Sequence, residues 1–213
     1  RALDNGATWI VVDPRYTRSA EMADIYCPIR SGTDIAFYGG LFNYILEHDL
    51  WQHEYVLNYT NASYLLDEEY SFDVETGIFS GFDKDSATYD AKTWHYQVES
   101  TKEWDTSEGG AYAWAKAEGV PEFTPPTVEV PKRDMTLQDP MCVFQQMKKH
   151  YSRYDLDTVS ATCGMDKELL EKVYATYAAT GAPDKSGTIL YALGQTQHTY
   201  GAQNCRSMGI LQL

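Results

Sequence analysis

The sequence lacks the short motifs by which many enzymes and metal proteins are recognised. It contains no GxGxxG, P-loop, HExxH or GxSxG pattern, so none of the common nucleotide-binding, zinc-protease or hydrolase signatures is present. It also has no CxxC pair, and this argues against a zinc ribbon or an iron–sulfur cluster held by this chain alone. The four cysteines are expected to be free thiols, and a disulfide among them cannot be assigned. They are Cys27, Cys142, Cys163 and Cys205.

Basic residues and long apolar runs are scarce as well. Lys and Arg number 17 against 31 Asp and Glu in 213 residues, which leaves a formal charge of −14. A general nucleic-acid binder, or a protein of anionic membrane surfaces, needs a basic face, so this balance argues against both. No run of 18 apolar residues marks a membrane span. With 43% hydrophobic residues the chain can still bury a core, and its length predicts about one to one and a half domains.

Residues 1–60 read as the first part of an α/β domain. Residues 8–12 are apolar and rich in β-branched side chains, which predicts a strand buried on both faces. A helix is expected to follow with Ser31 or Thr33 as its N-cap, because apolar residues then recur at helical spacing. A second helix is expected over residues 51–59.

Residues 61–133 are expected to form an inserted excursion. Between residues 61 and 110, twelve acids are accompanied by only three bases, and Gly, Ser, Thr and aromatic residues are interleaved among them. Since no long helical period is present, we expect a mostly irregular segment with short strands, docked onto a larger body by its aromatic residues. The acidic surface is read as a solvated face, with docking of a partner subunit as the alternative.

Residues 134–213 are expected to complete the α/β domain. One helix is predicted from residue 139 and another behind Asp166 as N-cap. Residues 188–193 predict a second buried strand, followed by a polar loop over 194–201 and a last helix. The expected fold class is therefore α/β, with a parallel, Rossmann-like sheet flanked by helices and a long acidic, mostly irregular insertion.

The first of three polar clusters comes directly after the predicted first strand. It consists of Asp13, Arg15 and Thr17. An acid in this place can accept hydrogen bonds from ribose hydroxyls, and a nearby arginine can fork onto phosphate. The alternative is a turn that is stabilised by an interaction between Asp13 and Arg15, with no ligand.

The second cluster, Gly32, Thr33 and Asp34, lies at a predicted helix N-terminus. Backbone N–H groups there attract anions. The carboxylate of Asp34 can also accept two parallel hydrogen bonds from the N1–H and the exocyclic amine of guanine. The alternative is an ordinary N-cap.

The third cluster is the polar loop between two glycines that follows the predicted second strand. Its amides, hydroxyls and imidazole offer many neutral donors and acceptors, which suits a polar heterocycle with phosphates better than a hydrolytic centre. The alternative is a hydrogen-bonded surface loop. The candidate binding residues in it are Gly194, Gln195, Thr196, Gln197 and His198.

Taken together, these stretches resemble the molybdopterin oxidoreductases of the dimethyl-sulfoxide-reductase type. The general resemblance rests on residues 11–17 (VVDPRYT) and 29–34 (IRSGTD). Residues 135–151 (MTLQDPMCVFQQMKKHY) and 191–204 (YALGQTQHTYGAQN) narrow it to the catalytic large subunit of respiratory, periplasmic-type formate dehydrogenases. The GIFSG stretch at residues 77–81 fits the same group.

The resemblance implies a large subunit of several domains that oxidises formate to CO₂. Such a subunit binds two molybdopterin guanine dinucleotides that chelate one molybdenum or tungsten, and a selenocysteine or cysteine completes the metal shell. A 4Fe–4S cluster lies near its N-terminus, outside this chain. Electrons pass to an iron–sulfur partner subunit, and the implied location is periplasmic.

The resemblance also assigns roles to the three clusters. Asp13, Arg15 and Thr17 would lie along the guanosine diphosphate arm. Gly32, Thr33 and Asp34 would hold ribose or guanine, and Gly194, Gln195, Thr196, Gln197 and His198 would face a dinucleotide or its pterin. No catalytic or metal-ligating residue is expected, because the selenocysteine or cysteine with its histidine, the cluster cysteines and the catalytic arginine of such enzymes are all missing.

The chain begins without Met, and we expect it to be a segment of a longer protein. Two other interpretations stay open. One is another reductase of the same superfamily, acting on nitrate or polysulfide. The other is a non-catalytic α/β module that binds or docks a partner. Neither nucleic acid nor direct insertion into a membrane is expected.

Overall fold

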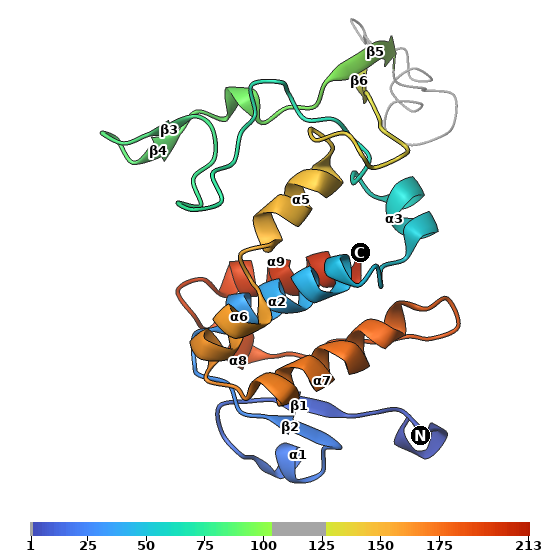
Figure 1. Cartoon of the computed structure of the whole chain (residues 1–213), viewed down its shortest axis with the longest axis vertical. Helices are drawn as coiled ribbons and strands as arrows, with labels where there is room; N and C mark the ends of the chain where they lie inside the picture. The colour runs from blue at the N-terminus through green and yellow to red at the C-terminus, as the bar shows by residue number, and fades with distance from the viewer. Residues whose placement is uncertain (1, 104–126) are drawn as a thin grey trace, which may run out of the picture. The chain divides into compact units, whose positions relative to one another are not determined.

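The computed structural model describes residues 2–103 and 127–213 (Figure 1). It divides into two compact units. The main unit consists of Arg1–Thr60 and Met147–Leu213, and the second unit of Asn61–Gln146. In sequence, the second unit therefore interrupts the main unit, whose two halves pack together.

The main unit begins with a pair of short parallel strands. β1 (Ile10–Val12) and β2 (Ile25–Cys27) pair in parallel, with Ile10 beside Ile25, and α1 (Arg18–Glu21) lies in the connection between them. The predicted first strand is thus confirmed, although it is shorter than expected and half-buried rather than buried on both faces. β2 was missed, because three residues are too few to show a periodic pattern. The described residues therefore combine helices with parallel strands, as in an α/β fold, but the parallel sheet among them has two strands.

A central helix organises the rest of the main unit. α2 (Asp34–Glu47) packs against α6 (Leu156–Cys163), α7 (Lys167–Ala178) and α9 (Gly201–Gln212), all from the second half of the unit (Figure 1). The core between them is made of apolar side chains of these helices and of β2. Burial of this apolar surface is the main force that holds the two halves together.

Tyr174 is the largest fully buried side chain of that core. Its hydroxyl donates a 2.6 Å hydrogen bond to the Phe37 carbonyl of α2, so its polar atom is satisfied. The close approach of α7 to α2 depends on Gly40, because a Cβ there would lie 2.6 Å from the Tyr174 hydroxyl oxygen and 2.8 Å from Cγ2 of Val159.

Aspartates cap two helices of the second half, α6 and α7, as the sequence predicts for α7. The Asp166 carboxylate accepts the N–H groups of Glu168 and Leu169 at 3.0 and 3.1 Å, and it caps α7. Asp155 caps α6 in the same way. The other helices in the described ranges are α3 (His53–Tyr59), α5 (Val143–Tyr151) and α8 (Leu193–Thr196), with 3₁₀ turns at Leu3–Asn5 and Ala179–Gly181.

One predicted strand and one predicted helix start are wrong. Residues 188–193 form no strand, and Leu190 within them is 90% exposed. A strand needs a neighbour for its backbone hydrogen bonds, and none of the strands in the described ranges pairs with this segment. The helix predicted from residue 139 begins at Val143, because the Asp139 carbonyl accepts the Cys142 N–H at 2.9 Å and closes a turn first.

Among its described residues, the second unit contains two small antiparallel strand pairs. β3 (Phe82–Asp83) pairs with β4 (Thr88–Tyr89), and β5 (Val98–Glu103) pairs with β6 (Thr127–Pro131). A 3₁₀ turn lies at Ala91–Thr93. Residues 104–126 of the expected acidic insertion lie outside the residues that the structure describes.

Aromatic packing and aspartate turns hold the second unit together. The Phe79 ring lies 4.8 Å from that of Phe72 and 6.0 Å from that of Trp94, measured between centroids. Asp134 accepts hydrogen bonds from the Thr136 hydroxyl and the Asp139 N–H, and these lower the pKa of its carboxyl to about 2. Some of the acidic residues of this unit therefore stabilise its turns.

All four cysteines are free thiols, and three of them are buried. Burial raises the pKa of the Cys27 thiol to about 11, which makes it unreactive. In the ranges that the structure describes, no helix is both long and apolar enough to cross a membrane.

Replacing Gly40 by alanine should destabilise the main unit by about 1–3 kcal/mol, because the added methyl group overpacks the contact with Tyr174 and Val159. Gly209→Ala on α9 is the matched control, since its Cβ would meet open space and alanine favours a helix. Denaturant unfolding of both variants tests this. Equal unfolding free energies would contradict the overpacking argument.

Candidate functional site

Asp13 leads the first predicted cluster and lies directly after β1. Its N–H donates to the Cys27 carbonyl at 3.2 Å, so it stands at the carboxyl edge of the strand pair. Its carboxylate accepts the Arg15 N–H at 2.7 Å, and the Thr17 hydroxyl accepts the Ala20 N–H at 3.3 Å to cap α1. The structure thus gives Asp13 and Thr17 local turn and capping bonds, while Arg15 is exposed.

The second cluster forms the turn between β2 and α2. Gly32 has a φ of +85°, a left-handed conformation that favours glycine. Thr33 is the N-cap residue of α2, but its hydroxyl donates to the Arg30 carbonyl at 2.7 Å and makes no side-chain cap. Arg30 in turn donates to the Thr162 carbonyl at 2.7 Å, which ties this turn to the end of α6.

Two long-range hydrogen bonds join this turn to α8 and to the start of α9, and a third joins α9 to α8. Nε2 of Gln195 donates to Oδ1 of Asp34 at 2.8 Å. The Tyr200 hydroxyl donates to the Gly32 carbonyl at 2.8 Å. Nδ2 of Asn204 donates to the Gln195 carbonyl at 3.0 Å. These five residues are called the Asp34 cluster below.

The Asp34 cluster contains two buried oxygens that lack donors. Oε1 of Gln195 and Oδ1 of Asn204 have no hydrogen-bond partner among the described residues, and Asn204 is fully buried. Buried polar atoms are nearly always paired, so these two call for donors from outside the described residues. Together with the carboxylate of Asp34, the cluster is rich in acceptors.

The structure brings part of the predicted site together. Gly32, Asp34 and Gln195 meet in the Asp34 cluster, whereas no hydrogen bond within the described ranges links Asp13, Arg15 or Thr17 to it. In the rest of the third cluster, Gly194, Thr196 and Gln197 are exposed, and the His198 ring stacks on that of Tyr200 with 5.6 Å between centroids.

Sequence reasoning missed Tyr200 and Asn204. Asn204 lies one helical turn before Met208, a core residue of α9, so it occupies the apolar face of that helix. A polar residue on such a face is the signal that could have identified it.

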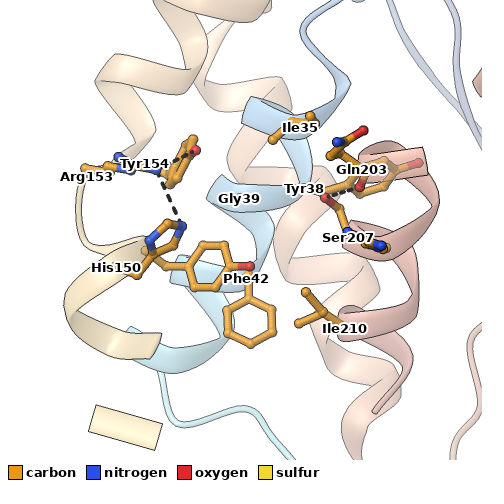
Figure 2. A pocket seen from close by; sticks show the side chains of 12 residues that line it. Ile35, Tyr38, Gly39, Phe42, His150, Arg153, Tyr154, Gln203, Ser207 and Ile210 are labelled. Carbon is orange, nitrogen blue, oxygen red and sulfur yellow. Dashed lines mark hydrogen bonds between the residues drawn. The ribbon is translucent and has the colours of Figure 1, made fainter. Parts of the chain in front are cut away.

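A cavity of about 300 Å³ lies among α2, the end of α5 with its following turn, and α9 (Figure 2). It is called the arginine cavity below, because Arg153 and Arg206 line it. Its other lining side chains are Ile35, Tyr38, Phe42, His150, Tyr151, Tyr154, Gln203, Ser207 and Ile210, with Gly39 in the wall formed by α2.

His150 is neutral at physiological pH in this cavity. Burial lowers the pKa of its imidazole from 6.5 to about 4, and the nearby charge of Arg153 adds to the effect. The Arg153 guanidinium lies 3.4 Å from Nε2 of His150 and from the Tyr154 hydroxyl oxygen. The neutral imidazole therefore acts as an acceptor for the arginine.

No metal centre is formed within residues 2–103 and 127–213. No group of three or more His, Cys, Asp or Glu side chains in these ranges is arranged to hold a metal ion. What the Asp34 cluster offers chemically is a group of hydrogen-bond acceptors.

Comparison with known proteins identifies the relatives of the chain. It is 50% identical over 213 residues to the formate dehydrogenase subunit alpha of Megalodesulfovibrio gigas, a match that covers 100% of this chain and 18% of that protein. It is 46% identical over 210 residues to the major subunit of the nitrate-inducible formate dehydrogenase of Escherichia coli K12, with 99% and 18% covered. This chain is homologous to formate dehydrogenase alpha subunits. The predicted resemblance is confirmed.

The chain spans about a fifth of the length of these curated relatives. No family model matches it. Its fold is similar to part of acetylene hydratase from Pelobacter acetylenicus, with a TM-score of 0.54 at 21% identity, and the match covers 99% of this chain and 17% of that structure. At this identity the likeness concerns the fold alone.

Gly32→Ala should loosen the Asp34 cluster. A Cβ on Gly32 would lie 2.6 Å from the Tyr200 hydroxyl oxygen, and the positive φ strains alanine by itself. We expect a loss of about 1–3 kcal/mol in unfolding free energy and faster hydrogen exchange in α9. Gly194→Ala, whose Cβ would meet open space, should change neither quantity. Unchanged exchange in Gly32→Ala would contradict the argument.

His150→Gln should flatten the pH dependence of stability. The unfolded chain binds a proton at His150 below about pH 6.5 while the folded chain resists protonation until about pH 4, so the stability this group contributes is present above pH 6.5 and lost as the pH falls towards 4. Between pH 7 and 4, the unfolding free energy of the variant should therefore fall by about 1–2 kcal/mol less than that of the unchanged protein, a figure reduced to allow for the partial exposure of His150. Unfolding measured from pH 7 to 4 checks it, and identical slopes would refute it.

Proposed function

We propose that this chain supplies part of the binding site for a molybdopterin guanine dinucleotide in a formate dehydrogenase large subunit. The observation that carries the proposal is the Asp34 cluster, in which two buried oxygens lack donors and lie with a carboxylate that can accept more than its one bond from Gln195. The N1–H and exocyclic amine of guanine, and the corresponding groups of a pterin, are such donors, so the ligand fits the cluster. The homology to formate dehydrogenase alpha subunits supports the same conclusion.

In this proposal, Asp34 accepts hydrogen bonds from the heterocycle, and Gln195 holds the carboxylate in place while offering its own Oε1. Thr33 and Gly32 shape the turn that presents Asp34. Asp13, Arg15 and Thr17 lie along the guanosine diphosphate arm, where the exposed guanidinium of Arg15 is free to fork onto phosphate. Gly194, Thr196, Gln197 and His198 complete the polar surface that faces a dinucleotide or its pterin.

The bound cofactor, with molybdenum or tungsten, supplies the redox chemistry by which formate is oxidised to CO₂. The residues of this chain bind and orient it. We place the selenocysteine or cysteine metal ligand and the 4Fe–4S cluster in other parts of the subunit. An iron–sulfur subunit receives the electrons, and the enzyme is periplasmic. These assignments rest on the resemblance.

The same proposal extends to the fold. The parallel pair β1–β2 is taken as part of a larger parallel, Rossmann-like sheet, since ligands of such sheets bind at the carboxyl edge where Asp13 and the Gly32 turn lie. The cofactor domain is built from residues 1–60 and 134–213 and is interrupted by the acidic insertion of residues 61–133.

Asp34→Asn in the full-length protein tests the proposal. The change replaces one acceptor oxygen by an amide donor that opposes the donors of guanine, so the content of guanine nucleotide and metal per protein should fall by about fivefold or more. Glu47→Gln, at the other end of the same helix and exposed, is the control and should retain both. Nucleotide released by acid and metal measured by mass spectrometry give the result. Full cofactor content in Asp34→Asn would remove Asp34 from the site.

A further inference from the structure

Arg30 is bonded to the end of a helix that lies far from it in the sequence. Its backbone N–H donates to the Cys163 carbonyl at 2.8 Å. Its Nη1 donates to the Thr162 carbonyl at 2.7 Å and to the Ala161 carbonyl at 3.4 Å. These three carbonyls belong to the last turn of α6, where C=O groups have no partner within the helix itself. Arg30 therefore supplies donors that the end of α6 needs.

The fourth carbonyl of that turn is satisfied locally. The Ser160 carbonyl accepts the N–H groups of Gly164 at 2.9 Å and Met165 at 3.2 Å. Gly164 has a φ of +66°, the left-handed conformation that often ends a helix, and a Cβ there would lie 3.3 Å from Nη2 of Arg30. The guanidinium thus lies close to the C-terminus of α6. Because this end of a helix carries a partial negative charge, a cation there stabilises it.

The carbonyl of Arg30 belongs to the turn of the Asp34 cluster. It accepts the Thr33 hydroxyl at 2.7 Å and the Thr33 N–H at 3.3 Å, which closes the turn around Gly32. The end of α6 contacts the turn a second time, because the Cys163 thiol donates to the Thr33 carbonyl at 3.7 Å. Since Thr33 directly precedes Asp34, these contacts fix the peptide from which the carboxylate extends.

The turn is thus held by two separate parts of the main unit. The end of α6 holds it through Arg30 and Cys163, whereas α8 and α9 hold it through Gln195 and Tyr200. A group that is held in place before its ligand arrives loses less conformational entropy on binding, so the affinity is higher. The contacts with α6 therefore affect binding at the Asp34 cluster without forming part of it.

We propose that Arg30 is a positioning residue of the cofactor site, which anchors the turn carrying Asp34 to the end of α6. It acts through the backbone of the turn and makes no contact with the ligand. Its effect is to keep the Asp34 carboxylate where Gln195 and the donors of the heterocycle meet it. This inference rests on the proposed function, because the position of Asp34 matters for the cofactor only if Asp34 binds it.

Arg30→Met in the full-length protein tests this role. Arg30 is exposed, and methionine keeps an apolar stem while removing every donor of the side chain. The content of guanine nucleotide and metal per folded protein should fall by about threefold or more, because a displaced carboxylate loses its charge-assisted bonds to the heterocycle. Arg30→Lys keeps a cation and donors at the helix end, so its content should stay within about twofold of that of the unchanged protein.

Lys167→Met is the matched control. Lys167 is also an exposed cation bonded to α6, because its Nζ donates to Oδ1 of Asp157 in the first turn of that helix at 2.6 Å. The substitution removes the same charge at the opposite end of α6. It should leave the cofactor content unchanged.

Hydrogen exchange of the same proteins separates positioning from direct contact with the ligand. In Arg30→Met, amides of the turn and of the last turn of α6 should both exchange faster, because each loses a partner that held it. In Asp34→Asn, which keeps Arg30, the last turn of α6 should exchange as in the unchanged protein. Cofactor loss in Arg30→Met without faster exchange in α6 would indicate that Arg30 touches the ligand itself, and would overturn the positioning role.

The remaining outcomes also decide the matter. Lower stability with full cofactor content in Arg30→Met would show a purely structural role, and the inference would fail while the proposed function stands. An equal loss in Lys167→Met, or no recovery in Arg30→Lys, would overturn the inference as well. Full cofactor content in Asp34→Asn would instead contradict the proposed function, and this inference with it.

Discussion

The hydrogen bonds that join the start of α2 to α8 and α9 determine what the main unit presents to a ligand. Gln195 to Asp34 and Tyr200 to Gly32 span 161 and 168 positions of sequence. Each bond adds only about 1 kcal/mol to stability, because it replaces bonds to water. Their larger effect is on position. Since the Gln195 amide donates to Asp34, its remaining oxygen and the carboxylate are held together as acceptors, and no local structure could bring these two groups to one place.

The elements that the sequence predicted well are those decided by local chemistry. Asp166 caps α7 because its own carboxylate reaches the next backbone N–H groups, and α2 follows from apolar residues at helical spacing. Residues 188–193 have the composition of a buried strand, but a strand exists only where another backbone pairs with it. β2 shows the converse, because three residues with no readable pattern become a strand beside β1.

The sequence predicted which residues belong to the candidate site, but it did not predict how they are arranged in space. Asp13 and Gln195 stood out because each follows a predicted strand, and Asp34 stood out because it lies at the start of a predicted helix. Which of them meet depends on how α9 packs on α2, and this is a tertiary property. Arg206 illustrates the same limit, because in sequence it reads as an ordinary exposed residue of a helix. It lines a cavity in the structure because α9 packs beside α2 and the Tyr154 ring lies against Gly39 of α2.

α2 connects the two polar regions and separates their roles. Asp34 in its first turn carries the negative charge of the acceptor cluster, and Tyr38, one turn later, lines the arginine cavity. Burial raises the pKa of the Tyr38 phenol, and the charge of Asp34 raises it further. The phenol therefore stays protonated at physiological pH. A single helix thus contributes to two polar regions of opposite character, because its first turn carries the carboxylate of the acceptor-rich Asp34 cluster and its side lines the cavity that Arg153 and Arg206 also line.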